Sequence, residues 1–353
     1  MSHMPEQIDH RRRRFLGATA MTLGAAHWLM TGSANAQSAD AGRPVASATR
    51  PWTNASFGTV KQIDAGVLNV GCVEAGPADG RPVILLHGWP YDIHSYVDVV
   101  PRLASAGYRV IVPHLRGYGT TRFLSNQTIR NGQQAAVALD IIALMDALKI
   151  DQAILAGYDW GSRTACVIAA LWPERCKAIV SANGYIVNNL ESNKHPLPPN
   201  AEHAWWYQFY FSTERGKAGL EANRRNFAKV IWKENSPKWN FDDATFNRTA
   251  ASFDNPDYVA VVVHNYRWRL SLAAGEPQYD IFEKRLATAP VITVPAITID
   301  GDANGVAPAS DGSAYAKKFT AKYAHRIVKG AGHNLPQEAP KAFADAVIEV
   351  ASY

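Results

Sequence analysis

Short apolar runs alternate with longer amphipathic segments along most of the chain. The apolar runs are almost unbroken, as in strands buried on both faces of a sheet, and they cover 83–86, 109–112, 153–156, 178–180, 296–299 and 326–328. The segments between them repeat apolar residues at helical spacing, over about 131–148, 163–171, 313–319 and 340–350. Glycine and proline mark the joins. This alternation predicts an α/β fold with a mainly parallel, doubly wound sheet and helices on both faces.

The alternation stops over residues 184–290, where aromatic residues, asparagine and proline are frequent. Five of the ten tryptophans lie there, namely Trp205, Trp206, Trp232, Trp239 and Trp268. A structureless loop of this length is uncommon in a compact domain. We therefore expect a helical lid at 184–290, inserted between two parts of one core domain at 37–183 and 291–353.

The first 36 residues have the pattern of an export signal. Arg12 and Arg13 precede an apolar stretch that runs to about Met30, and Ala34–Asn35–Ala36 offers small residues for cleavage. The arrangement resembles a twin-arginine signal, which implies a bacterial periplasmic or secreted protein. An uncleaved N-terminal anchor is the alternative, although an apolar run of about 15 residues is short for crossing a bilayer.

Composition and charge narrow the choice of partners. The chain has 47% hydrophobic and 19% charged residues and a formal charge of +5, which falls to +3 without the signal segment. A nucleic-acid partner is therefore not expected, nor is membrane association after signal cleavage, because no other stretch is long and apolar enough to span. The three cysteines, Cys72, Cys166 and Cys176, match no metal or redox spacing, so buried free thiols are expected. No signal for oligomeric state was identified.

A candidate nucleophile follows the strand at 153–156, in Gly157-Tyr158-Asp159-Trp160-Gly161. Small residues two before and two after a nucleophile suit a sharp strand-turn-helix, where a Cβ would clash with neighbouring backbone. The central residue is aspartate, whose carboxylate, with an ordinary pKa near ~3.9, is ionised at neutral pH and needs no base. It suits attack on an sp3 carbon that carries a leaving group. The alternative is that Asp159 only caps the following helix.

This elbow resembles that of the epoxide hydrolases and haloalkane dehalogenases of the α/β-hydrolase fold, over nearly the whole chain after the signal. The resemblance implies an oxyanion hole from the backbone N–H groups of Trp89, in His87-Gly88-Trp89-Pro90, and Trp160. It also implies a histidine between the last strand and the final helix, which is His333. His114 and His264 are expected to be structural.

The resemblance leaves the acid that supports His333 open. Enzymes of this type usually carry it three residues after the glycine of Asp300-Gly301, and this chain has Asn304 there. An amide can accept a hydrogen bond from the imidazole but cannot stabilise the imidazolium with a full charge. Three alternatives follow: Asp302 supplies the charge, Asn304 suffices at a lower rate, or Asn304 deamidates. We favour Asp302 among the three.

The residues of the expected lid help to distinguish an epoxide oxygen from a halide as the leaving group. Trp206-Tyr207 and Asn265-Tyr266 are similar to the two lid motifs of epoxide hydrolases, in which tyrosine hydroxyls support the epoxide oxygen as the ring opens. Tyr207 and Tyr266 match, and Tyr210 is the nearest alternative because it shares a helix face with Tyr207. The indoles of Trp89 and Trp160 could hold a halide, but dehalogenases commonly have asparagine where this chain has Trp89.

We therefore expect an epoxide hydrolase that opens a small-molecule apolar epoxide, of the bulky kind that an aromatic-rich lid suggests, to a vicinal diol. Asp159 forms an alkyl ester, Tyr207 and Tyr266 support the oxygen, and His333 activates the water that cleaves the ester. No metal or organic cofactor is required. A haloalkane dehalogenase with the same Asp and His is the first alternative, and a non-catalytic binding protein of this fold is the second.

Overall fold

A computed structural model describes residues 57–353, so the expected signal at 1–36 lies outside the described residues. The nine strands are β1 (Lys61–Ala65), β2 (Leu68–Ala75), β3 (Arg81–Leu86), β4 (Tyr108–Pro113), β5 (Arg122–Phe123), β6 (Ala153–Tyr158), β7 (Cys176–Ala182), β8 (Ala296–Gly301) and β9 (Tyr323–Val328). They form one sheet in the order β1-β2-β4-β3-β6-β7-β8-β9, with β5 paired to β2. The pairs from β4 through β9 are parallel, and the pairs that involve β2 are antiparallel.

All six strands expected from the sequence are present. The strands missed are β1, β2 and β5, at the antiparallel edge. β1 is largely exposed, so its residues do not form an unbroken apolar run. A two-residue turn of Gly66 and Val67 joins β1 to β2, and Gly66 has a φ of +59°, which glycine adopts without steric cost.

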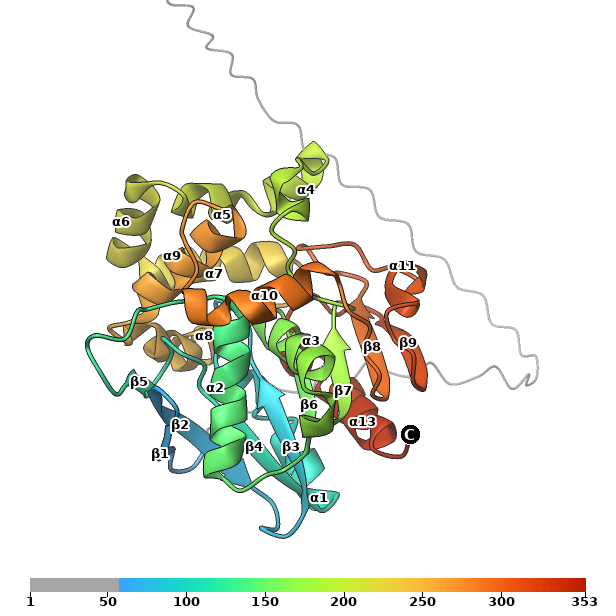
Figure 1. Cartoon of the computed structure of the whole chain (residues 1–353). Coiled ribbons are helices and arrows are strands. Elements are labelled where there is room, and N and C mark those ends of the chain that lie inside the picture. The colour runs from blue at the N-terminus through green and yellow to red at the C-terminus, as the bar shows by residue number, and fades with distance from the viewer. Residues whose placement is uncertain (1–56) are drawn as a thin grey trace, which may run out of the picture. The chain divides into compact units, whose positions relative to one another are not determined.

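Two layers of helix cover the sheet (Figure 1). α2 (Gln134–Ala147), α3 (Trp160–Leu171) and α10 (Asp280–Ala287) lie on one face, and α1 (Val100–Ser105) and α13 (Pro340–Val350) lie on the other. The short helices α11 (Ser313–Ala316) and α12 (Leu335–Glu338) lie near the carboxyl-terminal part of the sheet. None of the helices at 57–353 is long and apolar enough to cross a membrane.

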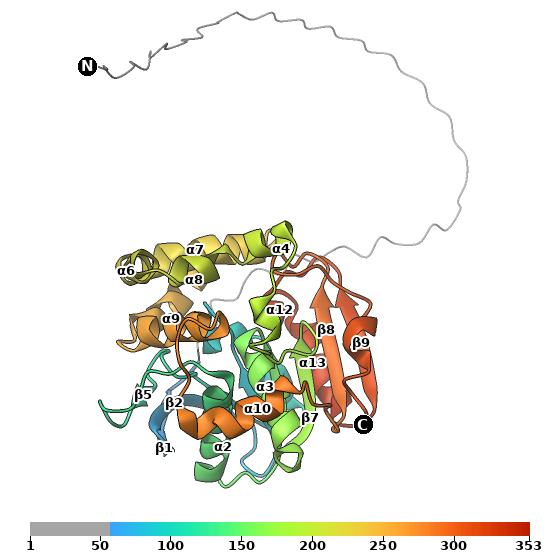
Figure 2. The same ribbon diagram turned by 45° about the horizontal axis from the view of Figure 1, so that its top comes forward.

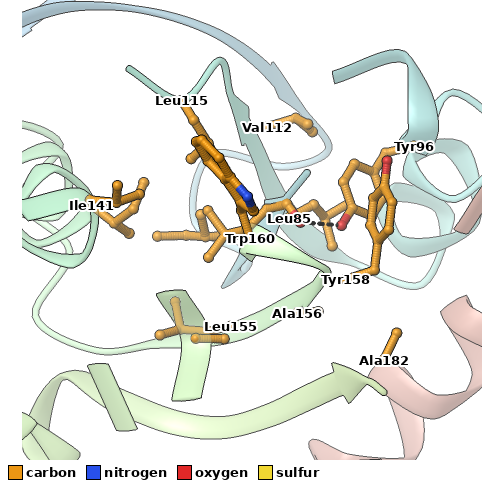
Figure 3. Packing of buried hydrophobic residues seen from close by; sticks show 14 of the residues in the cluster. Leu85, Tyr96, Val112, Leu115, Ile141, Leu155, Ala156, Tyr158, Trp160 and Ala182 are labelled. Carbon is orange, nitrogen blue, oxygen red and sulfur yellow. Dashed lines mark hydrogen bonds between the residues drawn. The ribbon is translucent and has the colours of Figure 1, made fainter. Parts of the chain in front are cut away.

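The core is densely packed where β6 passes into α3. Figure 3 shows the Trp160 indole lying toward Leu115, while Tyr158 lies beside Tyr96 with ring centroids 6.2 Å apart. The Tyr96 hydroxyl donates to Leu86 O at 2.6 Å, so burial leaves that hydroxyl satisfied. The fold thus fixes the residues on both sides of Asp159.

The lid is helical, as the sequence predicted, and lies above the carboxyl ends of the central strands (Figure 2). Its helices are α4 (Pro199–Ala204), α5 (Trp206–Phe211), α6 (Glu214–Ala222), α7 (Arg224–Asn235), α8 (Asp243–Ala250) and α9 (Tyr258–Arg269). The fully buried Trp232 stacks on Tyr91 of the core at 4.9 Å and on Trp239 at 5.1 Å. Its indole Nε1 donates to Pro90 O at 2.7 Å, which fastens the lid to the core.

The predicted lid boundary at residue 290 is too late, because α10 packs on the core. Phe282 contacts Trp172 with ring centroids 5.1 Å apart, and Leu286 is fully buried. Figures 1 and 2 both show α10 crossing near α2 and α3, below the lid helices. This boundary could not be predicted from the sequence, because α10 is a short amphipathic helix that follows other helices.

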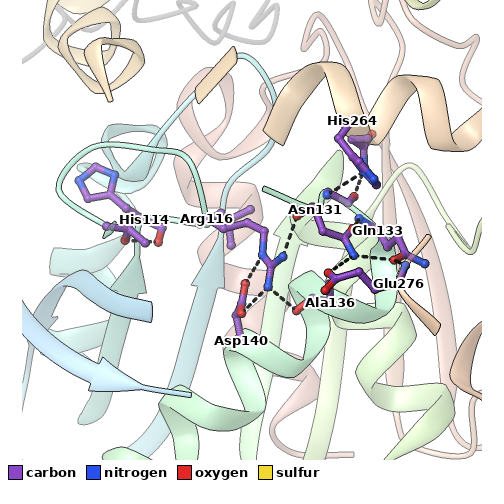
Figure 4. A network of polar contacts seen from close by, with 12 residues as sticks. His114, Arg116, Asn131, Gln133, Ala136, Asp140, His264 and Glu276 are labelled. Carbon is purple, nitrogen blue, oxygen red and sulfur yellow. Dashed lines mark hydrogen bonds and ion pairs between the residues drawn. The ribbon is translucent and has the colours of Figure 1, made fainter. Parts of the chain in front are cut away.

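A buried polar network joins the core to the end of the lid (Figure 4). Arg116 forms an ion pair with Asp140 of α2 at 2.6 Å and donates to Asn131 O at 2.6 Å. Asn131 Nδ2 donates to Glu276 at 2.6 Å, beyond the last lid helix. The N–H of Gly132 donates to Nδ1 of His264 in α9, so His264 has a structural role, as expected.

We predict that Glu283 makes the protein less stable as the pH rises. Burial raises the pKa of Glu283 from 4.5 to about 7, although it accepts hydrogen bonds from Gln134 Nε2 and Ala135 N. Between these values the folded state binds more protons than the unfolded state, so the free energy of unfolding falls with rising pH, by about 2 kcal/mol after solvent screening.

Glu283→Gln should flatten this part of the pH dependence and raise the melting temperature at pH 8, as measured by thermal unfolding from pH 4 to 8. The glutamine oxygen can still accept one of the two hydrogen bonds. The exposed Glu221 of α6 provides the control, because Glu221→Gln should leave the slope as it is. An unchanged slope in Glu283→Gln would contradict the prediction.

Candidate active site

The turn between β6 and α3 is the sharp elbow that the sequence indicated. Asp159 has φ 51° and ψ −122°, in the region that L-residues rarely adopt. A Cβ at Gly157 would lie 2.5 Å from Gly161 C, and a Cβ at Gly161 would lie 1.8 Å from Leu86 O. Both glycines are therefore required by close backbone contacts, and the backbone strain at Asp159 aims its side chain out of the turn.

The Asp159 carboxylate is held at both oxygens. Oδ1 accepts from the N–H of Trp89 at 2.8 Å, and Oδ2 lies 3.5 Å from Nε2 of His333. The side chain makes no capping bond to α3, so the alternative of a structural helix cap is wrong. Burial alone raises the pKa of Asp159, but His333, Arg163 and the Trp89 N–H outweigh burial and hold it below its ordinary value. Asp159 is thus ionised at neutral pH.

The expected oxyanion turn follows β3 and faces the elbow. A Cβ at Gly88 would lie 2.4 Å from Asp159 Cβ, so only glycine permits this approach. The turn contains a cis peptide bond between Trp89 and Pro90. Trp160 is the first residue of α3, where a backbone N–H has no acceptor within the helix. The N–H of Trp89 contacts Asp159, and that of Trp160 lies at the adjacent helix start.

His333 lies after β9, at the expected position, and is 3% exposed. Its backbone N–H donates to Ser236 Oγ at 3.0 Å, and Ser236 belongs to the lid. Ser236 in turn donates to Glu338 at 2.7 Å, and Glu338 also accepts from Gly332 N at 2.7 Å and Asn334 N at 3.0 Å. Glu338 therefore positions the histidine loop, a role that the sequence analysis missed. Burial raises the pKa of Glu338, but its three donors favour the charged form.

The structure does not bring Asp302 to His333, so the choice of Asp302 as the supporting acid is wrong for this geometry. Asp302 is exposed, and its Oδ1 accepts from Gly330 N at 2.6 Å. Nδ1 of His333 is buried and has no hydrogen-bond partner in the structure. The physical reason is that Asp302 follows directly on β8 and is drawn to the backbone after the neighbouring β9.

Asn304 lies in the same cavity as His333, but its amide is not turned to support the imidazole. Oδ1 accepts from Val306 N at 2.9 Å, and Nδ2 is buried without a partner. Deamidation is disfavoured, because it requires attack by the Gly305 nitrogen, and that N–H donates to Asn235 O at 2.9 Å. Asn304 is therefore held as an amide in the wall of the cavity that His333 also lines.

Both expected lid tyrosines lie above Asp159. Tyr207 of α5 lines the cavity, and Tyr266 of α9 packs against it with ring centroids 5.4 Å apart. Their rings contact Trp89 at 4.9 Å and 5.2 Å, directly over the oxyanion turn. Burial raises the pKa of both hydroxyls, and the charge of Asp159 raises each further. The two hydroxyls are therefore protonated at neutral pH.

The alternative tyrosine, Tyr210, points away from the site. Its ring stacks on Phe227 at 5.9 Å, and a Cβ at Gly219 would lie 2.0 Å from its hydroxyl, which places that hydroxyl against α6. His114 is also outside the cavity lining, and burial lowers its pKa to about 3. Both residues are structural rather than catalytic.

A cavity of about 750 Å³ opens onto Asp159, Tyr207 and His333. Its wall combines aromatic residues of the lid with polar residues of 183–195, so it is more polar than the sequence suggested. Two arginines line it, Arg163 from α3 and Arg269 from α9, and the sequence analysis missed both. Arg163 could have been noticed, because it lies four residues after Asp159, about one turn into the helix that Asp159 precedes.

Within 57–353 no group of three or more His, Cys, Asp and Glu side chains could hold a metal ion. The three cysteines are buried and free, as expected. The groups that the described residues bring together at the cavity are a carboxylate, a histidine, two phenols and a backbone N–H.

Comparison with known proteins agrees with this geometry. The model of the alpha/beta hydrolase fold family matches residues 81–340. A crystal structure of a Klebsiella pneumoniae protein proposed to be an epoxide hydrolase is 56% identical, with a TM-score of 0.83, and covers 85% of this chain and 100% of that one.

Two curated relatives match over shorter stretches. Epoxide hydrolase B of Mycobacterium tuberculosis is 32% identical over 42% of this chain and 45% of its own length. A haloalkane dehalogenase of Mycobacterium marinum is 30% identical over 43% of this chain and 48% of its own length. The alignments span less than half of either relative. With its elbow, oxyanion turn and histidine loop in place, and with the family model matching most of its length, this chain belongs to the α/β-hydrolase fold family.

Proposed function

We propose that the protein is an epoxide hydrolase that works through an ester on Asp159. The observation that carries this proposal is the state of the Asp159 carboxylate, with Oδ1 on the Trp89 N–H and Oδ2 toward His333, beneath the protonated Tyr207. The carboxylate is ionised without a base, and a phenol is placed to support an oxygen leaving group.

The first half-reaction opens the ring. Asp159 Oδ2 attacks an epoxide carbon, a C–O bond of the ring breaks, and its electron pair goes to the epoxide oxygen. That oxygen takes a proton from Tyr207 or Tyr266, while Oδ1 stays on the Trp89 N–H as the carbonyl oxygen of the new ester. Burial makes the phenols weaker acids by raising their pKa, and the transfer remains favourable because an alkoxide is a stronger base than a phenolate.

The second half-reaction cleaves the ester. His333 Nε2 takes a proton from water, whose oxygen bonds to the ester carbon of Asp159, and the resulting oxyanion remains on the Trp89 N–H. The bond to the alkyl oxygen then breaks, and His333 returns its proton to that oxygen, which completes the vicinal diol. The acid proton left on Asp159 passes to the tyrosinate, so Asp159 is again a carboxylate, the tyrosine is again a phenol, and one water is consumed for each epoxide.

Haloalkane dehalogenation is the second candidate. Trp89 and Trp160 lie on either side of Asp159, and each indole carries an N–H group that could donate to a halide. Neither indole is part of the cavity wall, whereas Tyr207 is, and this favours an oxygen leaving group. Bromide release from a bromoalkane, measured beside diol formation, distinguishes the two reactions, and the absence of both would indicate a binding protein.

We also propose that the protein is exported through a twin-arginine route. Arg12 and Arg13, the apolar stretch to Met30 and the small residues before Gln37 support this proposal. The N-terminal sequence of the protein from a periplasmic fraction should begin near Gln37, and Arg12→Lys with Arg13→Lys should retain it in the cytoplasm. A full-length chain with its N-terminus intact would contradict cleavage.

The ester can be detected directly in a single turnover with styrene oxide in 18O-labelled water. The first diol should carry no label, because its new oxygen comes from Asp159, and the label should enter the Asp159 carboxylate. His333→Gln should let the ester accumulate, which mass spectrometry of the intact protein reads as one added substrate mass. Label in the first-turnover diol would rule out the ester route.

The same trapped ester tests the lid tyrosine. In the His333→Gln background, Tyr207→Phe should slow ester formation by about 10- to 100-fold, because general acid support is reduced while Tyr266 remains. Tyr210→Phe is the matched control, since that hydroxyl lies against α6, and it should leave the rate of ester formation unaltered. Equal rates in the two variants would contradict the role of Tyr207.

We predict that Asn304→Asp speeds the second half-reaction. A carboxylate can keep the Val306 N–H at one oxygen and offer the other to the unpaired His333 Nδ1, whose imidazolium it then stabilises. Ester decay, followed by quenched-flow mass spectrometry, should rise by at least about 10-fold with little change in ester formation. Asp302→Ala serves as the control and should decay at the wild-type rate. Unchanged decay in Asn304→Asp would contradict the prediction.

A further inference from the structure

Two arginines in the active-site cavity have no part in the reaction outlined above. Arg163 extends from α3, and Arg269 ends α9, so one comes from the core and one from the lid. The Nε atoms of both are buried without a hydrogen-bond partner, and neither guanidinium forms an ion pair within the described part of the chain. Lys194, the third cation of the wall, pairs with Glu191 at 2.8 Å.

Arg163 is an unusual residue to leave unpaired. It is 6% exposed, and buried arginines are normally matched by a carboxylate or several carbonyl groups. Burial is the main cause that lowers its pKa to about 10, and the charge of Arg269 is the next. The guanidinium remains charged at neutral pH, so the folded protein keeps a poorly solvated cation beside Asp159.

Arg269 approaches the same place from the lid. Its guanidinium carbon lies 5.7 Å from the ring centroid of Tyr266, and its charge acts on both Arg163 and Tyr207. Two like charges that converge on one cavity repel each other unless an anion lies between them. The fold therefore places the guanidinium groups of Arg163 and Arg269, each with a fork of N–H donors, around one cavity.

The carboxylates already present do not fill this role. Asp159 is engaged by Trp89 and His333, and Glu202, the other acid of the wall, accepts from Leu197 N at 2.7 Å. Asp159 together with Arg163 and Arg269 leaves a single positive charge in this group of three side chains. A ligand with one negative charge would neutralise it, and carboxylate geometry matches the guanidinium fork.

Resting on the function proposed above, we propose that the preferred substrate is an epoxide that carries a carboxylate, bound by Arg163 and Arg269 while Asp159 attacks the ring. Arg163 lies on α3, four residues after Asp159 at the N-cap, which is about one helical turn, or ~6 Å along the axis. The carboxylate is therefore close to the epoxide, as in a short epoxy acid. The lid aromatics are left to hold the apolar part of the molecule.

A matched substrate pair tests this specificity. Phenylglycidate and phenylglycidamide share the epoxide and the ring and differ only in charge. The wild-type kcat/KM should be higher for the acid by about 10- to 100-fold, the usual effect of hydrogen bonds to a charged group. Arg163→Met and Arg269→Met should each reduce the acid-to-amide ratio toward one, and Arg163→Lys should recover part of it.

Arg215→Met is the matched control, because it removes the charge of an exposed arginine of α6 that lies outside the cavity. Its acid-to-amide ratio should equal that of the wild type. Thermal unfolding of each variant checks folding, and calorimetric binding of phenylacetate against phenylacetamide measures the anion site without turnover. Phenylacetate should bind more tightly than the amide, and this difference should be lost in both arginine-to-methionine variants.

The outcomes separate the two proposals. An acid-to-amide preference that survives both arginine substitutions, or a preference for the amide in the wild type, would overturn the anion site and leave epoxide hydrolysis standing. If the wild type hydrolyses neither compound, the proposed function fails. Phenylacetate binding that is weakened in the Arg163→Met and Arg269→Met variants would then still support the anion site. Phenylacetate binding that is unchanged in both variants would refute it.

Discussion

The close approach of β3 and β6 at their carboxyl ends is the constraint on which the site depends. These neighbouring parallel strands pair from Val83 with Ile154 to Leu86 with Gly157, and their next residues turn toward each other. Gly88 admits the Asp159 side chain, and the positive φ of Asp159 directs its carboxylate to the Trp89 N–H. The strain at one residue is offset by the packing of the whole central sheet.

Much of the core fold could be predicted, because strands buried on both faces leave unbroken apolar runs. β9 is not buried on both faces in this way, because it lies at the sheet edge and is only partly buried along its length. The hairpin of β1 and β2 lacks such a run, and α10 resembles the lid helices in sequence but packs on α3. Whether a segment forms a sheet edge or the end of the lid depends on which surface of the folded protein it covers. The local sequence does not specify that surface.

The residues of the candidate site likewise include some that could be predicted from the sequence and some that could not. Asp159, Trp89 and His333 follow local geometry at strand ends, so motif spacing placed them, and Tyr207 and Tyr266 followed from lid motifs. The support of His333 could not be read from spacing. Asp302 and Asn304 are two residues apart, and only the backbone partners that each acquires, Gly330 and Val306, decide where their side chains point. Arg269 joins the cavity only through the packing of α9.

The attachment of the lid has a consequence for how the protein admits its ligands. Ser236 accepts the backbone N–H of His333, and the Trp232 indole donates to the oxyanion turn at Pro90. A hinged opening of this lid would pull on the His333 loop and on the turn at Pro90 together. Movement of α7 is therefore coupled to both, whereas the cavity wall at 186–197 precedes the lid helices α4 to α9.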